Sequence, residues 1–306
     1  MSTLRLSAVP RDTTLDAPAD DFDPDASSCD FRFVLRSEYG DAPTVVGSIG
    51  VAMCVGQTVP RYWYYVGKVA YRSDEPMLAR NDRVLLLGND FTGAHELRGI
   101  RLAEPADPSH LDALLIGTLA LMPADAATPG HAVPVILEAP GRGRAERAPF
   151  WMGTGRHFYP LSFPELSGDA RLEWESQLAS LLPRQPLVVS LLDTDTQMAI
   201  GACAEDATAL RDAALRCGFR QSQQIRICDG GPVFESMTSL LRFASGACME
   251  TSASLDHGHR CVIRSEDRLD AWIVDAERVA GGIAVASANA TIREALRDRA
   301  WDYSFF

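Results

Sequence analysis

The chain has 306 residues, of which 46% are hydrophobic and 23% charged, a composition typical of a globular protein with one large domain or two smaller ones. Its net charge is −12, from 29 basic and 41 acidic residues. Because phosphate binding needs clustered Lys and Arg, this balance argues against nucleic acid as the main partner.

Seven cysteines are scattered through the chain without a CxxC pair, and the only close histidine pair is His257 and His259. The pattern predicts neither a disulfide framework nor a metal site, and it favours a reducing cytoplasm. The N-terminus has no basic-then-apolar signal pattern, and the longest apolar stretches, such as Leu111 to Met122, are too short to span a bilayer. We therefore expect a cytoplasmic protein without a membrane partner.

The N-terminal quarter alternates strand-like and polar segments. Thr3 to Val9 alternates as a strand does, and the acidic stretch from residue 12 to 30 predicts a loop. Phe31 to Arg36 and Val45 to Val55 are expected to pair as strands. In Tyr62 to Tyr65, four aromatic residues in a row predict core packing, with a ligand-facing wall as the alternative.

A polar elbow follows. Val84 to Leu87 has strand length, the turn is rich in Gly, Asn, Asp and Thr, and a second strand-like segment runs from Glu96 to Leu102. Two strands joined in this way place backbone amides, a carboxylate and hydroxyls at one point. The pattern alone leaves open whether the elbow is a candidate site or an ordinary β-hairpin loop.

Beyond the elbow, a helix is expected from about Leu111 to Leu121, with Asp107 as N-cap and Pro108 in its first turn. Val133 to Leu137 predicts a short buried strand. The basic segment from residue 141 to 147 predicts a solvated loop, with an anion contact as the alternative.

The second half predicts two similar units, each running helix, glycine, aromatic and strand: Phe150 to Tyr159 and Ala213 to Ile227. Between and after them we expect an amphipathic helix over residues 170 to 182, strands over Val188 to Leu192 and Gln224 to Cys228, a helix from Asp206 to Cys217, and a tight turn at residues 229 to 232. Short strands at Cys261 to Arg264 and Ala271 to Val274 and a helix from Ile292 to Arg299 predict a small β-rich end piece.

The chemistry that the elbow could support is acylation of an amine. A base must take a proton from the ammonium nucleophile, and Glu96 could serve if it is buried. His95 should point to the opposite face of the strand, and Thr92 could orient a substrate. The simpler interpretation is a surface carboxylate for Glu96 and a structural histidine for His95. GxSxG, P-loop and GxGxxG motifs do not occur, so neither a serine hydrolase nor a dinucleotide enzyme is supported.

Four segments resemble one family. Asn89 to Leu97 is similar to the "NDxTGxxEL" signature of bacterial arginine N-succinyltransferases, members of the GNAT acyltransferase superfamily. Tyr62 to Gly67, Pro149 to Phe158, and Gly218 to Glu235 resemble the family's "WYxYxVG", "SPFWxxxGxxFF" and "GFRYxxxxxxxDGGPxxE". The resemblance covers roughly residues 31 to 275.

The resemblance implies an α/β (α+β) fold: a GNAT-like mixed sheet flanked by helices, with two related half-units in a core of residues 1–240 and a small C-terminal β-rich piece of residues 241–306. It implies acyl-CoA as co-substrate with no tightly bound cofactor, and the amino group of arginine or a related amino acid as acceptor. The residues implied are Glu96 and His95 for catalysis, Asn89, Asp90, Thr92, Gly93, Asp229 and Glu235 for substrate binding, and Ile100 and Leu102 for the acyl-CoA.

Three departures from the family matter. The family's first helices are replaced by the acidic loop. The family's basic, glycine-containing phosphate loop is replaced by residues 104 to 109, where prolines remove donors and carboxylates repel phosphate. The family's proposed catalytic histidine aligns with Ala204, with Cys203 and Glu205 as near substitutes.

The leading hypothesis is an N-acyltransferase that moves an acyl group from a thioester donor, such as succinyl-CoA, to arginine or a related amino acid. Two alternatives stay open: a non-catalytic paralogue that binds a ligand or serves as a partner subunit, and an acyltransferase that uses a non-CoA carrier. The partners expected are two small molecules, an amino acid and an acyl thioester, and the chain could form a homo- or hetero-oligomer.

Overall fold

A computed structural model describes residues 3–9, 29–38, 43–104, 107–122, 132–143, 145–164, 166, 168–246, 248–252, 255, 258–286, 290–297 and 299–306. The predicted acidic loop, apart from Cys29 and Asp30, lies outside the described residues, as does His257. Within the described ranges, no helix is both long and apolar enough to cross a membrane.

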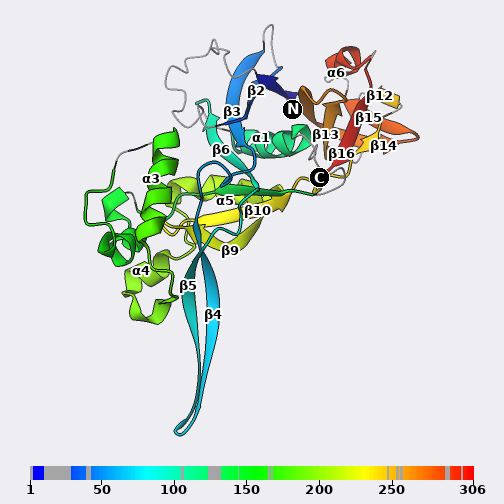
Figure 1. The fold of residues 1–306 in the computed structure, drawn as a ribbon. Coiled ribbons are helices and arrows are strands. Elements are labelled where there is room, and N and C mark those ends of the chain that lie inside the picture. Colours follow the sequence, from blue (N-terminus) through cyan, green and yellow to red (C-terminus); the bar gives the residue numbers. More distant parts are fainter. Residues whose placement is uncertain are drawn as a thin grey trace.

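Runs of consecutive strands, β1 to β6 and β9 to β15, flank a middle part of the chain that holds most of the helices (Figure 1). The strands are β1 (Leu4–Val9), β2 (Phe31–Ser37), β3 (Thr44–Ala52), β4 (Trp63–Asp74), β5 (Met77–Gly88), β6 (His95–Leu102), β7 (Pro134–Glu138), β8 (Leu187–Val188), β9 (Arg220–Arg226), β10 (Pro232–Met237), β11 (Ala244–Ser245), β12 (Cys248–Ser252), β13 (His259–Ser265), β14 (Asp270–Val279), β15 (Gly282–Ala286) and β16 (Trp301–Phe305). The helices are α1 (Pro108–Leu121), α2 (Pro149–Gly153), α3 (Gly168–Leu181), α4 (Thr194–Ala199), α5 (Thr208–Arg216) and α6 (Ala290–Ala295).

The strands form one continuous hydrogen-bonded sheet. Its order is β11-β16-β13-β14-β1-β2-β3-β6-β7-β10-β9-β4-β5-β8, and β15 adds to β14 and carries β12. The pairs β6–β7 and β12–β15 are parallel, whereas the other pairs are antiparallel. The predicted mixed α/β sheet flanked by helices is confirmed.

The predicted N-terminal strand joins the two parts of this sheet. β1 pairs with β2 on one side and with β14 on the other, so the C-terminal strands continue the central sheet. Those strands also enclose a hydrophobic cluster of their own, which includes Trp272, Ile283 and Trp301. The division into residues 1–240 and 241–306 stays a prediction.

The centre of the sheet is the unit β6-α1-β7. Parallel neighbours need a crossover, and α1 supplies it. The Asp107 side chain accepts a hydrogen bond from Ser109 N at 2.8 Å, and Pro108 occupies the first turn, as the sequence predicts. Nearly every residue of α1 from Leu111 onward is buried, which explains why this helix is apolar on all sides.

The elbow joins strands that do not pair with each other, so the simple hairpin interpretation is wrong. β5 pairs with β4 and β8, whereas β6 pairs with β3 and β7. Local polar contacts close the turn: Thr92 N and Oγ1 both donate to Asn89 O, at 2.9 and 2.8 Å. Gly93, at φ +90°, donates its N–H to Val55 O at 2.8 Å.

Two short strands were predicted where the chain coils instead. The segment after α2 is a 3₁₀ turn, Gly155–His157, rather than an aromatic strand. The aromatic residues around it gather on one side: the ring centroid of Trp151 lies 6.1 Å from that of Tyr159 and 4.9 Å from that of Phe163. In a strand, successive side chains would point to opposite faces. The strand expected over Val188 to Leu192 is also largely a 3₁₀ turn, Val189–Leu191.

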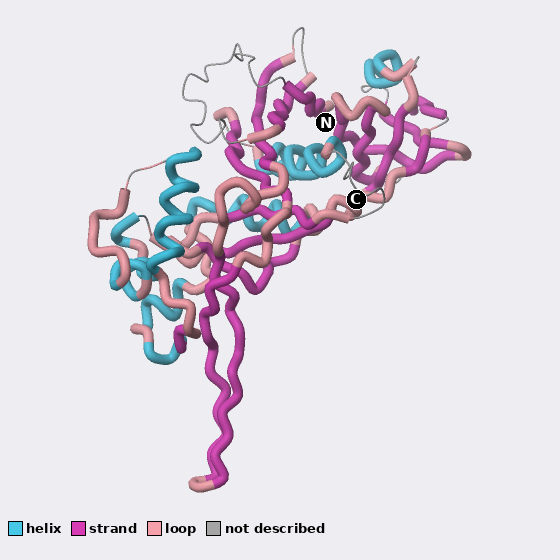
Figure 2. Tube along the Cα trace, viewed as in Figure 1, coloured by secondary structure: helices cyan, strands magenta, loops and turns pink. Residues whose placement is uncertain are grey.

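The most prominent feature that the sequence did not predict is a long arm. β4 and β5 pair over their whole length, from Trp63↔Gly88 to Asp74↔Met77, and extend far from the body (Figure 2). Only the base of the arm is supported by other strands, through β9 at Trp63–Tyr65 and β8 at Val84 and Leu85. Met77, near the tip, is 87% exposed. The distal arm therefore contributes little to the packing of the body.

We predict that shortening the arm leaves the body intact. In the variant, Lys68 and Arg83, which face each other in the ribbon, are joined by an Asn-Gly turn, a sequence that suits two-residue hairpins. The free energy of unfolding, measured by urea titration, should change by no more than about 0.5 kcal/mol. As a control, Leu85→Ala at the buried base should cost about 2 to 5 kcal/mol. A shortened arm as destabilising as the control would contradict the account.

Candidate functional site

The site forms where β6 and β7 part. The two strands pair only from His95↔Val135 to Leu97↔Leu137. Beyond Leu97, β6 continues beside β3 with a register shift opposite Ser48 to Gly50, and Gly99 adopts φ +60°. A bulge of this kind bends a strand away from its neighbour. Within the described chain, the edge of β6 that faced β7 has no further strand partner.

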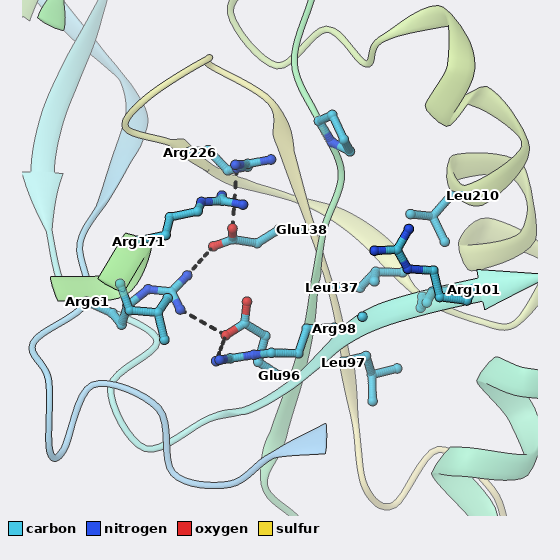
Figure 3. A pocket seen from close by; sticks show the side chains of 14 residues that line it. Arg61, Glu96, Leu97, Arg98, Arg101, Leu137, Glu138, Arg171, Leu210 and Arg226 are labelled. Carbon is cyan, nitrogen blue, oxygen red and sulfur yellow. Dashed lines mark hydrogen bonds and ion pairs between the residues drawn. The ribbon is translucent and has the colours of Figure 1, made fainter. Parts of the chain in front are cut away.

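A cavity of about 270 Å³, here called the splay cavity, fills this opening (Figure 3). Residues 96–101 of β6 form one wall, and Leu137, Glu138 and Pro140 form the facing wall. Its lining holds five arginines and two glutamates, namely Arg61, Arg98, Arg101, Arg171, Arg226, Glu96 and Glu138. The wall charge is therefore cationic on balance, which suits an anionic ligand group.

Arg61 connects the two walls. Its Nη1 donates to Glu96 Oε2 at 3.0 Å and its Nη2 donates to Glu138 Oε1 at 2.9 Å. Arg98 donates to the same Glu96 oxygen. Arg61 is almost fully buried, and burial lowers the pKa of its guanidinium, but the two carboxylates outweigh that effect and raise the pKa above its usual value. A single buried cation thus spans the mouth of the splay.

Glu138 is the most heavily contacted carboxylate of the site. Trp63 Nε1 donates to Oε1 at 2.7 Å, and Arg226 Nε lies 3.4 Å from Oε2. Burial by itself raises the pKa of this carboxyl, but the guanidiniums of Arg61, Arg226 and Arg171 more than offset burial and hold it below its ordinary value. Glu138 is therefore ionised at neutral pH.

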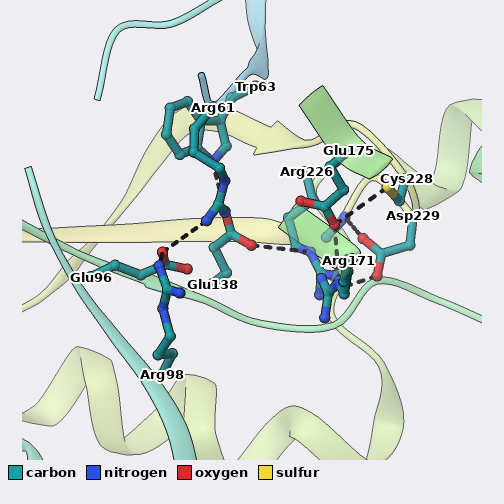
Figure 4. Close-up of polar contacts among 11 residues, drawn as sticks. Arg61, Trp63, Glu96, Arg98, Glu138, Arg171, Glu175, Arg226, Cys228 and Asp229 are labelled. Atoms are coloured by element: carbon teal, nitrogen blue, oxygen red, sulfur yellow. Dashed lines mark hydrogen bonds and ion pairs between the residues drawn. The ribbon is translucent and has the colours of Figure 1, made fainter. Parts of the chain in front are cut away.

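A second cavity of about 260 Å³, here called the aromatic cavity, adjoins the first. It is lined by Pro140, Gly143, Phe163, Pro164, Leu166, Arg171, Trp174, Glu175, Arg226, Cys228 and Asp229. Its polar groups come from α3 and from the end of β9 (Figure 4). Arg171 Nε donates to Glu175 Oε1 at 3.0 Å, and Arg226 Nη1 lies 3.3 Å from Asp229 Oδ2.

The start of α1 is closed to phosphate. Ser109 N donates to the Asp107 side chain, His110 N donates to Asp107 O, and Pro108 has no N–H. Amides at a helix N-terminus normally bind anions, but here the first ones are used internally, beside a carboxylate. The hydrogen bond from Ser109 N lowers the pKa of Asp107 below its usual value. This geometry agrees with the missing phosphate loop seen in the sequence.

The structure distributes the sequence-predicted residues over several places. Glu96 and Ile100 line the splay cavity, and Asp229 lines the aromatic cavity. His95 is buried on the other side of β6, where Cys54 N donates to its Nδ1 at 3.4 Å. Leu102 packs against the main hydrophobic core instead of lining either cavity.

The polar residues of the elbow lie apart from both cavities. Asn89, Asp90 and Thr92 are exposed, and neither they nor Gly93 belong to either lining. Glu235 is also outside, because it pairs with Arg220 at 3.0 Å on the face of β10. The roles given to these residues by the resemblance stay predictions.

Ala204 takes a position next to both cavities. Its N–H donates to Pro140 O at 2.8 Å, and Pro140 lines both cavities. The neighbouring Gly141 forms a bridge with Cys203. Burial raises the pKa of the Cys203 thiol, and Glu205 is exposed. The position where the family carries its proposed catalytic histidine therefore borders the site, but holds a methyl group.

Sequence reasoning missed most of the charged residues of the site. They are Arg61, Arg98, Arg101, Glu138, Arg171, Glu175 and Arg226. The available signal was weak: Arg171 and Glu175 are one helical turn apart, a spacing equally typical of an exposed ion pair. Only the fold brings α3, β4, β7 and β9 together.

Comparisons with known proteins find similarity to arginine N-succinyltransferases. The family model described as "Arginine N-succinyltransferase beta subunit" matches residues 13–243. The arginine N-succinyltransferase subunit beta of Pseudomonas aeruginosa is 31% identical over 219 residues, which cover 70% of this chain and 62% of that protein. The arginine N-succinyltransferase of Yersinia pseudotuberculosis is 27% identical over 231 residues, covering 74% and 64%. The match thus spans less than two thirds of either relative.

A solved structure shares the fold. The arginine/ornithine succinyltransferase subunit AI from Pseudomonas aeruginosa superposes with a TM-score of 0.67 at 19% identity, over 100% of this chain and 99% of that one. At this identity the likeness concerns the fold.

Glu138→Gln should destabilise the protein in a pH-dependent way. Breaking a buried ion pair leaves arginines without a counter-charge and should cost about 3 to 5 kcal/mol at pH 7. Because the folded-state pKa of Glu138 is below its ordinary value, its stabilisation is present above about pH 4.5 and is lost as the pH falls toward the folded pKa. Urea unfolding at pH 7 and pH 3 should show the gap between wild type and variant narrowing in acid.

Glu235→Gln provides the matched control, because its partner Arg220 is 81% exposed. This exposed pair should be worth less than about 1 kcal/mol at either pH. Equal effects of the two substitutions at pH 7 would contradict a buried network centred on Glu138.

Proposed function

The chain belongs to the arginine N-succinyltransferase beta subunit family, and from that premise we propose that it is an N-acyltransferase. It moves an acyl group from a thioester donor, acyl-CoA and first of all succinyl-CoA, to the amino group of arginine or a related amino acid. The donor is a co-substrate, with no tightly bound cofactor. Seven cysteines scattered through the chain without a CxxC pair fit a cytoplasmic enzyme.

The observation that carries this proposal is the open edge of β6 inside the splay cavity. A pantetheine arm contains amide groups, and an unpaired strand edge offers backbone N–H and C=O groups to such a chain, as it would to another strand. Ile100 lies in this stretch of the lining. The excess of arginine around the cavity fits an acyl group that ends in a carboxylate, such as succinyl.

The reaction requires few protein groups. The acceptor ammonium loses a proton, its nitrogen attacks the thioester carbonyl carbon, a C–N bond forms, and the C–S bond breaks as the thiolate takes up a proton. Donors such as Arg61 and Arg98 face the cavity in which negative charge builds on the carbonyl oxygen. Glu96, whose carboxylate lies between these two arginines, is our candidate to bind or deprotonate the ammonium. His95 lies on the other face of β6, so it would affect the reaction by positioning this strand.

The closed N-terminus of α1 favours a second candidate donor. With the first amides of α1 used internally and Asp107 beside them, the nucleotide end of CoA gains little from this helix. A pantetheine thioester on a carrier would bind in the splay cavity and would need no phosphate contact with α1. The non-catalytic alternative draws on Ala204, because a methyl group transfers no proton.

The proposed function predicts thiol release that depends on Glu96. Wild-type protein with succinyl-CoA or acetyl-CoA and an amino-acid acceptor should liberate thiol, followed with a thiol-reactive dye. Glu96→Gln should lower turnover by about 100-fold or more if Glu96 handles the proton. Glu173→Gln, which changes an exposed carboxylate on α3 outside both cavities, is the matched control. Absence of turnover in wild type, with no effect of Glu96→Gln on ligand binding, would refute the proposal.

A comparison of two donors separates CoA from a carrier. If the nucleotide contributes nothing, succinyl-pantetheine should support turnover with a kcat/KM within about tenfold of succinyl-CoA, a difference of roughly 1.4 kcal/mol or less. A loss of more than about 1,000-fold with the shortened donor would show that the nucleotide is bound and would favour CoA.

A further inference from the structure

The aromatic cavity shares a wall with the splay cavity. Pro140, Arg171 and Arg226 line both. Figure 4 shows Glu138 between the two groups of arginines, with Arg61 on one side and Arg171 and Arg226 on the other. A molecule in the aromatic cavity would therefore lie next to a thioester held in the splay cavity.

The charges of the aromatic cavity are balanced, unlike those of the splay cavity. Arg171 pairs with Glu175 and Arg226 with Asp229, so the lining holds two cations and two anions. The guanidiniums outweigh the burial of Glu175 and hold its pKa below the ordinary value, so this carboxylate is ionised. Paired opposite charges at short range are complementary to a zwitterion.

The remaining wall is apolar and aromatic. The Phe163 and Trp174 ring centroids lie 4.9 Å apart, and Leu166 and Pro164 complete the lining beside them. Such surfaces bind apolar side chains, whereas the few polar groups fix orientation.

Two buried N–H groups that line this cavity lack a hydrogen-bond acceptor in the described part of the chain. Trp174 is 7% exposed, and its indole N–H has no hydrogen-bond acceptor among the described residues. The Arg226 Nε–H is also without one, because Glu138 Oε2 at 3.4 Å is an ion-pair contact only. Buried donors without acceptors are rare and costly, and they indicate that a further acceptor belongs here.

We propose that the aromatic cavity is the acceptor subsite and that it takes an α-amino acid with an uncharged side chain, an inference that rests on the proposed N-acyl transfer. The carboxylate lies against Arg171 and the Trp174 N–H. The ammonium lies against Asp229, which borders the wall shared with the splay cavity. The side chain packs on Phe163, Leu166 and Trp174.

The preference for an uncharged side chain follows from the charge balance. A neutral amino acid enters as a zwitterion and leaves the lining balanced. The guanidinium of arginine would add one buried cation, whereas Glu175 and Asp229 each already face an arginine. An unpaired charge in a buried site is unfavourable. The inference therefore keeps the proposed N-acyl transfer but replaces its acceptor, arginine or a related amino acid, by an uncharged amino acid, and it departs from the arginine that the relatives' names state for those proteins.

Calorimetry with the intact protein tests the subsite directly. Phenylalanine or leucine should bind at least about tenfold more tightly than arginine. Leu166→Ala should weaken phenylalanine binding by about tenfold. Leu161→Ala is the matched control, because Leu161 lies in the same loop but outside the aromatic cavity, and it should leave binding unchanged.

A pair of ligands tests the role of the indole N–H. Trp174→Phe keeps an aromatic ring but removes the donor. It should weaken the binding of phenylalanine and leave the binding of phenethylamine, which lacks the carboxylate, unchanged. Equal losses for both ligands would indicate a packing defect and overturn the assignment of the carboxylate.

Other outcomes also decide the matter. Tighter binding of arginine, equal effects of Leu166→Ala and Leu161→Ala, or no binding of any amino acid would overturn the inference.

Titration with the thioester donor distinguishes this inference from the proposed function. Amino-acid binding as predicted without thioester binding or turnover would sustain the subsite and refute the proposed function. Turnover that is unchanged by Leu166→Ala would support the proposed function and refute the subsite.

Discussion

The candidate site of this protein depends on two strands that begin as neighbours and then separate. β6 and β7 part after Leu97 and Leu137, and the gap between them holds buried carboxylates that would repel each other if left alone. The Arg61 guanidinium forms ion pairs with both Glu96 and Glu138. The same cation therefore neutralises the two carboxylates and links the two walls of the gap. Removing a partner from such a network is costly because the remaining charges stay buried.

The same separation determines how the surrounding elements are used. α1 returns the chain from β6 to β7, while α3 and the end of β9 bring Arg171 and Arg226 to the far side of Glu138. The result is a cationic splay cavity next to a charge-balanced aromatic cavity. This difference in charge is what assigns the donor to one and the acceptor to the other in the proposed reaction.

Local patterns predicted the elements well where a local cause dominates. The cap at Asp107 and the apolar run that follows predicted α1, and alternation predicted β1 and β2. The elbow at Asn89 to Leu97 drew attention to the strand that lines the splay cavity through Glu96 and Ile100. The roles predicted for Asn89, Asp90 and Thr92 stay predictions: these residues are exposed and lie outside both cavities, and polar turn residues look alike whether they bind a ligand or close a turn.

The charged centre of the site was beyond local reasoning. Arg61, Glu138 and Arg226 lie far apart in the sequence and meet only through the sheet order β7-β10-β9-β4. The long arm escaped prediction for a related reason: its distal half is exposed on both faces, so its sequence lacks the apolar alternation that marks a half-buried strand. Conversely, the sequence alone predicted that the start of α1 would not bind phosphate. Prolines remove N–H donors and a capping aspartate accepts the remaining ones, and both effects depend only on neighbouring residues.

The most direct test of the two-cavity account is a crystal structure with a bisubstrate compound. In this compound the sulfur of pantetheine is linked through a short acyl chain to the nitrogen of phenylalanine. The account predicts the pantetheine along the open edge of β6 beside Ile100, and the phenylalanine ring against Phe163 and Trp174, with Arg171 and Arg226 at the junction. An amino-acid portion outside the aromatic cavity, or a pantetheine outside the splay, would contradict it.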